Sequence, residues 1–100
     1  MEKLKAHYSL SIMQQLIREG KYRITASARK TAIEEMNLSE SEVTESILDL
    51  IPSDLYKSMT TLHNSKLWQD VYHKKLGNKN AYIKLQLLDD NTIIISFKEK

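Results

Sequence analysis

Cysteine is absent from this sequence, which excludes disulfides and metal sites built from thiolates. Only two glycines are present, and no glycine-rich phosphate loop, dinucleotide fingerprint, HExxH or GxSxG motif occurs. No apolar run approaches the roughly 20 residues that a bilayer-spanning helix needs. The N-terminal MEKLKAHYSL also lacks the apolar core of a secretory signal. We therefore expect a cytoplasmic protein with no metal and no cofactor.

The composition that remains is typical of a globular protein, with 41% apolar and 28% charged residues. One hundred residues suffice for one hydrophobic core but not for two. The sequence shows no internal repeat, low-complexity tract or linker. We expect a single domain over residues 1–100.

The net charge of +2 conceals a segregation of charge along the chain. Residues 1–33 hold seven Lys or Arg against two Glu, residues 34–54 hold seven acids and no base, and residues 55–100 hold eight Lys against four acids. Such blocks predict one acidic helix in a mainly basic molecule, whose field attracts a polyanion to one side. The alternative is a set of solvated faces without a common function.

The first half of the chain has helical periodicity. Leu10, Met13, Leu16 and Ile17 follow the possible caps Ser9 or Ser11, and Gly20 supplies a stop. A second helix is predicted over about 26–36, with Thr25 as its cap and Ala28, Ala32 and Met36 as its apolar stripe. Ser39 and Glu42 form a capping-box pattern that opens a third helix, which we expect Pro52 to end.

From residue 54 the apolar period changes to two, which predicts strands over 54–61, 66–73, 80–88 and 92–98. The turns fall at His63-Asn64-Ser65, Gly77-Asn78 and Asp89-Asp90-Asn91. Short connections imply antiparallel neighbours. The predicted fold class is α+β, with about three N-terminal helices on one face of a mainly antiparallel C-terminal sheet.

The stretch from Leu55 to Tyr72 carries the densest set of reactive side chains. Alternation places Leu55, Lys57 and Met59 on one side of the first strand and Tyr56, Ser58 and Thr60 on the other. On the later strands, Gln69 and His73, Tyr82 and Lys84, and Ser96 and Lys98 share a polar side. We expect one sheet face to be core and the other to be a basic, hydroxyl-bearing surface.

That surface suits RNA chemistry. Three converging ammonium groups, on Lys57, Lys84 and Lys98, can stabilise charge on phosphate oxygens, and their mutual repulsion lowers at least one lysine pKa. Tyr82 can move a proton or stack on a base, and Gln69 can fix a phosphate or a ribose hydroxyl. A cleavage without metal requires the 2′-hydroxyl of RNA as its nucleophile, which DNA lacks.

Simpler interpretations exist for each of these residues. Exposed lysines keep sheet edges soluble, and Trp68 and Phe97 are more typical of a core. His7 and His63 are expected to have no role in chemistry, whereas His73 has a pKa suited to proton transfer. A divalent metal on Asp70, Asp89 and Asp90 is an alternative, although two of these lie in a turn.

Four segments, DLYKSMTT, LWQDVY, AYIKL and SFKEK, together resemble the MqsR toxins, the RNA-cleaving members of bacterial type II toxin–antitoxin pairs with a RelE/YoeB-like fold. The resemblance is continuous over about residues 53–100. In the first half it rests on the opening MEK and the helix layout. It implies an mRNA endoribonuclease that works without the ribosome, prefers GCU-type sites, arrests growth under stress and is inhibited by a cognate antitoxin, zinc-containing and DNA-binding in some members.

The resemblance also assigns roles to residues. The catalytic positions fall on Lys57, Gln69, Tyr82 and Lys98. Tyr56 and Met59 are family-like and are expected to line a base pocket, and His73 and Lys84 are also expected to bind substrate. The family typically has arginine where this chain has His73, which puts substrate affinity and sequence preference in question. Competing hypotheses are a ribosome-dependent cutter of the same fold and a non-catalytic RNA- or protein-binding module. The antitoxin is expected either to block the basic surface or to dock elsewhere.

Overall fold

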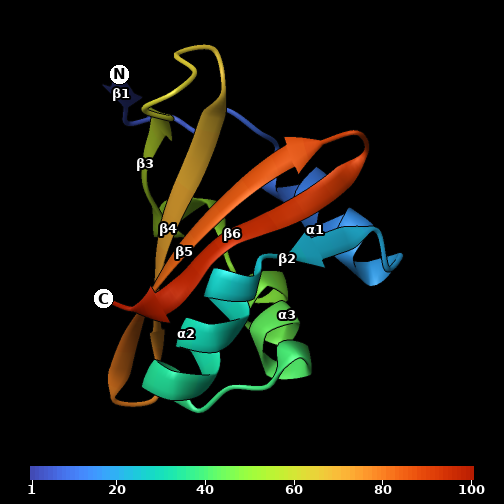
Figure 1. Ribbon diagram of the computed structural model, residues 1–100, viewed down its shortest axis with the longest axis vertical. Coiled ribbons are helices and arrows are strands. Elements are labelled where there is room, and N and C mark those ends of the chain that lie inside the picture. The colour runs from blue at the N-terminus through green and yellow to red at the C-terminus, as the bar shows by residue number, and fades with distance from the viewer.

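The computed structural model describes residues 1–100 as six strands, three α-helices and one short 3₁₀ helix. The strands are β1 (Glu2–Lys3), β2 (Tyr22–Ile24), β3 (Leu55–Thr60), β4 (Trp68–Leu76), β5 (Lys79–Leu88) and β6 (Asn91–Glu99). The helices are α1 (Leu10–Arg18), α2 (Ala26–Met36) and α3 (Glu40–Leu48), and the 3₁₀ helix is Pro52–Asp54. Figure 1 shows the long β4, β5 and β6 running beside one another, with the helices to one side.

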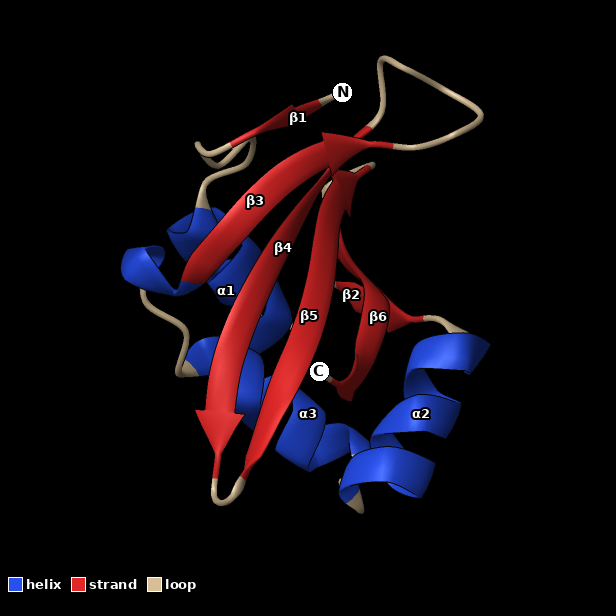
Figure 2. Cartoon of the chain, turned by 90° about the vertical axis from the view of Figure 1, so that its left-hand side faces the viewer, coloured by secondary structure: helices blue, strands red, loops and turns tan.

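All six strands form one sheet in the order β1-β3-β4-β5-β6-β2. Every neighbouring pair is antiparallel except β2 and β6, which are parallel. In Figure 2, β3, β4 and β5 cross in front of α1 and α3, so the sheet has one covered face and one open face. The predicted α+β class is confirmed.

The helix starts agree with their predicted caps. Ser9, Thr25 and Ser39 each accept a backbone N–H of the first turn with their side-chain oxygen. Glu42 completes the capping box by accepting the N–H of Ser39, at 3.0 Å from its carboxylate. None of the three helices is long and apolar enough to cross a membrane.

Helix α3 ends before the position that Pro52 predicts. Its last residue is Leu48, and Pro52 instead begins the 3₁₀ helix. The Gln14 side chain from α1 donates to the carbonyls of Ile47 and Leu50, at 3.0 and 2.9 Å. These bonds satisfy acceptors that the end of a helix leaves free, so the chain can leave the helix early.

Four of the six strands match the predicted ones within a few residues, and their turns lie where the sequence indicates. Asp89 and Asp90, both at positive φ, connect β5 to β6 in a two-residue turn that suits the twist of a hairpin. The edge strands β1 and β2 were not predicted, because two or three residues show no measurable period. Each is held by pairing with a longer strand, β3 for β1 and β6 for β2.

The hydrophobic core lies between the helices and the covered face of the sheet. Its strand members include Tyr72, Ile83, Leu85, Ile94 and Phe97, all almost fully buried. The opposite side of the same strands, which we call the open face, carries the polar residues Lys57, Gln69, His73, Tyr82, Lys84 and Lys98. No helix covers the open face (Figure 2).

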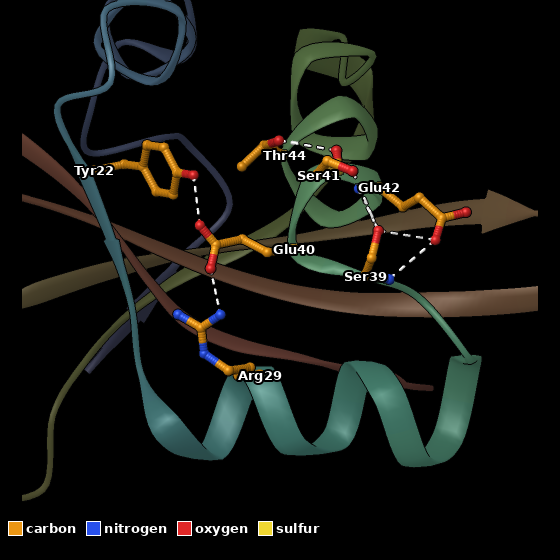
Figure 3. Close-up of polar contacts among 7 residues, drawn as sticks. All are labelled: Tyr22, Arg29, Ser39, Glu40, Ser41, Glu42 and Thr44. Carbon is orange, nitrogen blue, oxygen red and sulfur yellow. Dashed lines mark hydrogen bonds and ion pairs between the residues drawn. The ribbon is translucent and has the colours of Figure 1, made fainter.

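A polar cluster ties the edge strand β2 to the two helices that follow it. The carboxylate of Glu40, the first residue of α3, accepts hydrogen bonds from the Tyr22 hydroxyl at 2.7 Å and from the Arg29 guanidinium (Figure 3). The bond from Tyr22, followed by the one from Arg29, lowers the pKa of Glu40. This cluster lies at the β2 edge of the sheet and stabilises the placement of α2 and α3.

Candidate active site

A β-bulge at the start of β3 places two adjacent side chains on the open face. Leu55 pairs with Tyr72 and Lys57 pairs with Val71, so Tyr56 is an extra residue. The strict alternation predicted for this strand is therefore wrong at Leu55, which packs against the core, and at Tyr56, whose ring stacks on His73. A strand without the bulge would keep Tyr56 and Lys57 on opposite faces.

Tyr82 lies at the centre of the open face. The Lys98 ammonium is 5.1 Å and the Lys84 ammonium 5.8 Å from the centroid of the Tyr82 ring. The Lys57 charge also acts on the Tyr82 phenol. The sheet register explains this gathering, because Tyr82 pairs with Lys98 on β6 and with His73 on β4.

An aromatic stack adjoins the lysines. The rings of Tyr56 and His73 lie parallel with centroids 4.2 Å apart, and the His73 and Tyr82 centroids are 5.9 Å apart. Half of the Tyr56 surface is exposed. Burial, with a smaller contribution from the Lys100 charge, lowers the pKa of His73. A neutral imidazole at neutral pH is thus held beside an exposed phenol ring, which suits stacking on a nucleobase.

The surroundings shift the pKa values of Lys84 and Lys57 in opposite directions. Burial, followed by the charges of Lys98 and Lys57, lowers the pKa of Lys84. The expected repulsion contributes to this shift, although burial is the larger cause. Lys57 has a raised pKa because it donates to the Glu2 carboxylate at 2.7 Å. The site therefore holds one lysine that loses its proton more readily and another that retains it.

The pKa of the Tyr82 phenol is shifted upward, whereas a general base at neutral pH needs a lowered pKa. Burial raises its pKa, and the nearby Lys57 charge offsets the shift only in part. The phenol therefore keeps its proton at neutral pH. In this state the hydroxyl can donate a hydrogen bond to an anionic oxygen or to a leaving group.

Gln69 lies beside the cluster and is held by a second amide. Its Nε2 donates to Oε1 of Gln86 on β5 at 3.1 Å, and Gln86 is almost fully buried. Met59 pairs with Gln69 and lies half-buried toward the β1 edge. The bond to Gln86 leaves the carbonyl oxygen of Gln69 free to accept from a hydroxyl.

The other residues singled out from the sequence lie on the covered side or in loops. Phe97 is core as predicted, but Trp68 is only half-buried, with Lys3 Nζ 4.2 Å from its ring centroid and the His7 ring stacked on it at 5.3 Å. The chain before α1, rather than a helix, covers this end of β4. His63 is exposed in a loop.

Asp70 has a structural environment. Its buried carboxylate accepts the backbone N–H groups of His7 and Tyr8 at 2.9–3.1 Å. Asp89 and Asp90 lie in the β5–β6 turn. No group of three metal-binding side chains gathers anywhere in the chain.

Comparison with known proteins decides the family. The family model described as "Motility quorum-sensing regulator, toxin of MqsA" matches residues 5–99. The chain belongs to the MqsR toxin family. A member from Escherichia coli strain K12, named mRNA interferase toxin MqsR, is 40% identical over 100 residues, covering the full length of both chains. The similarity therefore extends through the helical first half, beyond the segments that carry the resemblance in the sequence alone.

The eight residues expected to form the MqsR-type site lie on the one open face. Lys57, Tyr82, Lys84 and Lys98 form its charged centre, Tyr56 and His73 its aromatic side, and Gln69 and Met59 its margin toward β1. Their roles in this member of the family stay predictions.

Three further residues of this face have a part in it that the sequence did not indicate. Val71 is fully buried between its register partners Lys57 and Lys84, whose aliphatic stems can cover it. Gln86 holds Gln69, and Glu2 binds Lys57. The alternation of β5 places Gln86 on the polar side, so the sequence could have indicated a contact between Gln86 and Gln69. Nothing in the sequence signals Glu2, which is 55 positions from Lys57.

Proposed function

We propose that this protein cleaves single-stranded mRNA at GCU-type sites, without a ribosome and without a metal ion. Membership of the MqsR family makes it an mRNA interferase toxin, and hence an endoribonuclease. The observation that supports the proposed site is the gathering of Lys84 and Lys98 over the Tyr82 ring on an uncovered sheet face, with the Lys57 charge acting on the Tyr82 phenol. These groups offer donors where a phosphodiester develops negative charge.

The proposed reaction uses the nucleophile within RNA. The 2′-oxygen loses its proton and attacks the adjacent phosphorus, and the bond from phosphorus to the 5′-oxygen breaks. The departing 5′-oxygen takes a proton, so the products carry a 2′,3′-cyclic phosphate and a 5′-hydroxyl. Lys57 and Lys98 stabilise the extra charge on the phosphate oxygens during this exchange.

Proton transfer is assigned from the direction of the pKa shifts. Lys84, whose pKa is lowered by burial, is the lysine most readily deprotonated to accept the 2′-proton. Tyr82, whose pKa is raised by burial, is suited to donate to the leaving oxygen. Gln69 orients a ribose hydroxyl or phosphate through its free carbonyl oxygen.

Base selection is assigned to the aromatic side of the open face. Tyr56 and His73 offer stacked rings to an unstacked base, and Met59 provides an apolar margin. Single-stranded RNA is typically read in this way, with bases splayed onto aromatic side chains. A neutral His73 contributes stacking and hydrogen bonding instead of the bidentate phosphate grip that arginine provides.

The proposed partner is a cognate antitoxin, because the family is described as the toxin of MqsA. An antitoxin with zinc and a DNA-binding function would allow the toxin–antitoxin complex to bind DNA. Two modes of inhibition stay open, namely coverage of the open face and docking elsewhere with the face left exposed. The proposed location is the cytoplasm, where mRNA is found.

The test is cleavage of a long purified transcript in EDTA, with mapping of the ends. We expect fragments at GCU-type sites with cyclic phosphate and 5′-hydroxyl ends, and no cleavage by Lys57→Ala. The variant Lys30→Ala, which removes an exposed lysine from α2, is the matched control and should cleave normally. Intact but retarded RNA would support a binding module. Cleavage only after addition of ribosomes would support the ribosome-dependent alternative.

A further inference from the structure

Glu2 is an exception on the open face. The register of β1 against β3 places it beside Met59, on the same side as Lys57. The Lys and Arg residues that the strand register assigns to this side are Arg23, Lys57, Lys75, Lys84 and Lys98. Glu2 is the one carboxylate among the strand residues of the open face. A carboxylate lowers the attraction of this surface for a polyanion, so the presence of Glu2 beside Lys57 requires a reason.

The Glu2 carboxylate binds one specific ammonium group. Its Oε2 is 2.7 Å from Lys57 Nζ, and this bond joins two residues from distant parts of the sequence. The Lys57 side chain is 22% exposed and that of Glu2 is 58% exposed. A mainly buried lysine stem thus ends in a charge that is fixed from the edge of the sheet by β1.

We propose that Glu2 is a positioning residue, which holds the Lys57 ammonium in the active site against repulsion by Lys84 and Lys98. This inference rests on the proposed ribonuclease function. A lysine ammonium has three N–H donors. One donor is directed at Glu2, and the other two stay available for phosphate oxygens. Without the carboxylate, the flexible lysine would move away from the two neighbouring positive charges.

The electrostatics of the cluster agree with this role. The charged and titratable groups around the ion pair are Tyr56, Tyr82, Lys84, Lys98 and the N-terminal amine, whose charge also acts on Glu2. The hydrogen bond that Lys57 donates to the Glu2 carboxylate raises the pKa of Lys57, whereas burial and the neighbouring lysines lower the pKa of Lys84. Glu2 therefore keeps one ammonium charged and localised in a site that otherwise disfavours crowded positive charge.

If Glu2 positions Lys57, replacing Glu2 should affect RNA affinity and kcat differently. The carboxylate repels RNA phosphates, so removing it should leave RNA affinity unchanged or raise it. A misplaced Lys57 should lower kcat, and displacements on the order of an ångström are costly in active sites. A role limited to folding would change RNA binding and kcat together, through the amount of folded protein. An exposed ion pair also contributes little to stability.

The decisive variants are Glu2→Leu and Glu2→Gln. Leucine keeps the bulk and removes the acceptor, and glutamine keeps a neutral acceptor. We expect kcat to fall roughly tenfold in Glu2→Leu and less in Glu2→Gln. The Kd for an RNA with 2′-deoxy nucleotides at the cleavage sites should stay equal or decrease. Glu45→Leu, at an exposed position of α3, has the same change of charge and should cleave as the wild type does.

A wild-type kcat in Glu2→Leu would overturn the inference while leaving the ribonuclease function intact. Parallel loss of RNA binding, kcat and thermal stability would also overturn it, since that pattern indicates a structural role. If the wild type does not cut naked RNA, the proposed function fails, and the inference is judged from ¹H–¹⁵N spectra of the lysine ammonium groups. An unchanged Lys57 ammonium signal in Glu2→Leu would then overturn it, and loss of that signal would support it.

Discussion

At the residue scale, Tyr82 shows how environment assigns a role to an ordinary side chain. Its ring lies near two ammonium groups, and burial raises the pKa of its hydroxyl. A tyrosine in water is already protonated at neutral pH, and here the protonated form is favoured further. In the proposed mechanism, the positive surroundings attract the phosphate to which this hydroxyl would donate.

Tyr82→Phe removes only this hydroxyl. We expect kcat to fall by about 10²–10⁴, the usual contribution of a general acid, with little change in RNA affinity. Single-turnover cleavage of a GCU-containing RNA measures the effect. Tyr22→Phe removes a hydroxyl bound to Glu40 at the β2 edge and is expected to cleave normally. An active Tyr82→Phe would remove this residue from the mechanism.

The lowered pKa of Lys84 predicts that RNA affinity depends on pH. Because burial lowers the pKa of Lys84, its ammonium loses its proton at a lower pH than an exposed lysine does. Charge on the open face, and with it RNA affinity, should thus decrease as pH rises through this lowered pKa. In Lys84→Arg the charge persists, so the affinity for uncleavable RNA should hold to higher pH. Fluorescence anisotropy at a series of pH values measures this, and identical profiles would contradict it.

His73 marks a departure from the arginine expected by resemblance to the family. His73→Arg adds a permanent charge beside Tyr56 and Tyr82. We expect tighter RNA binding and a salt slope, log K against log salt, that is steeper by about 0.7. A titration of uncleavable RNA at several salt concentrations reports both quantities. An unchanged slope would place this position away from phosphate.

At the element scale, two bulges adapt the sheet to its site. The β3 bulge brings Tyr56 and Lys57 to the same face, and a second irregularity sets Lys84 opposite Ser96 but Leu85 opposite Ile94. Each bulge shifts the alternation so that core residues and polar residues stay on their proper sides. The helices, by contrast, follow local rules of capping and periodicity.

The capping box of α3 provides a test of that local rule. Ser39→Ala removes the side-chain acceptor of the Glu42 N–H (Figure 3) and should lower the free energy of unfolding by about 1 kcal/mol. Urea denaturation measures the loss. Ser65→Ala, in an exposed loop, should change stability by less than about 0.5 kcal/mol. Cleavage per folded molecule should be unchanged in both variants, because α3 lies on the covered side.

At the scale of the whole molecule, charge is unevenly distributed over the two sides of the sheet. The acids of residues 34–54 lie mainly on α2, α3 and the turn after them. The strand lysines of the open face are Lys57, Lys75, Lys84 and Lys98, whereas Lys74 and Lys79 reach carbonyls on the covered side. A polyanion is therefore drawn to the uncovered side. The acidic block of the sequence thus lies on the side away from the open face, although Arg29 and Lys30 on α2 lie on that side as well.

Lys75 tests how far the RNA extends along this field. It is exposed on β4, two positions beyond His73 on the same face. If the RNA runs along β4, Lys75→Ala should flatten the salt slope by about 0.7 with unchanged kcat at saturating RNA. Lys30→Ala on α2 is the control and should leave the slope as it is. Equal salt slopes for the wild type, Lys75→Ala and Lys30→Ala would indicate that RNA contacts only the lysines around Tyr82.

The sequence by itself determined the fold class, three helix starts and four strands, because these depend on local periodicity, caps and turn residues. Ser39 with Glu42 and the Asp89-Asp90 turn are clear cases, since each is encoded within four residues. The resemblance of DLYKSMTT and LWQDVY indicated the family that the comparison then established.

Only the tertiary structure decided which side chains meet. The bulge that turns Tyr56 to the open face, the edge strands β1 and β2, and the half-exposed Trp68 all depend on pairing between distant segments. The contact of Glu2 with Lys57 does so as well. A strand's period fixes alternation but not the point where an extra residue interrupts it. That point is set by the partner strand, because hydrogen-bond register and burial on the covered face must both be satisfied.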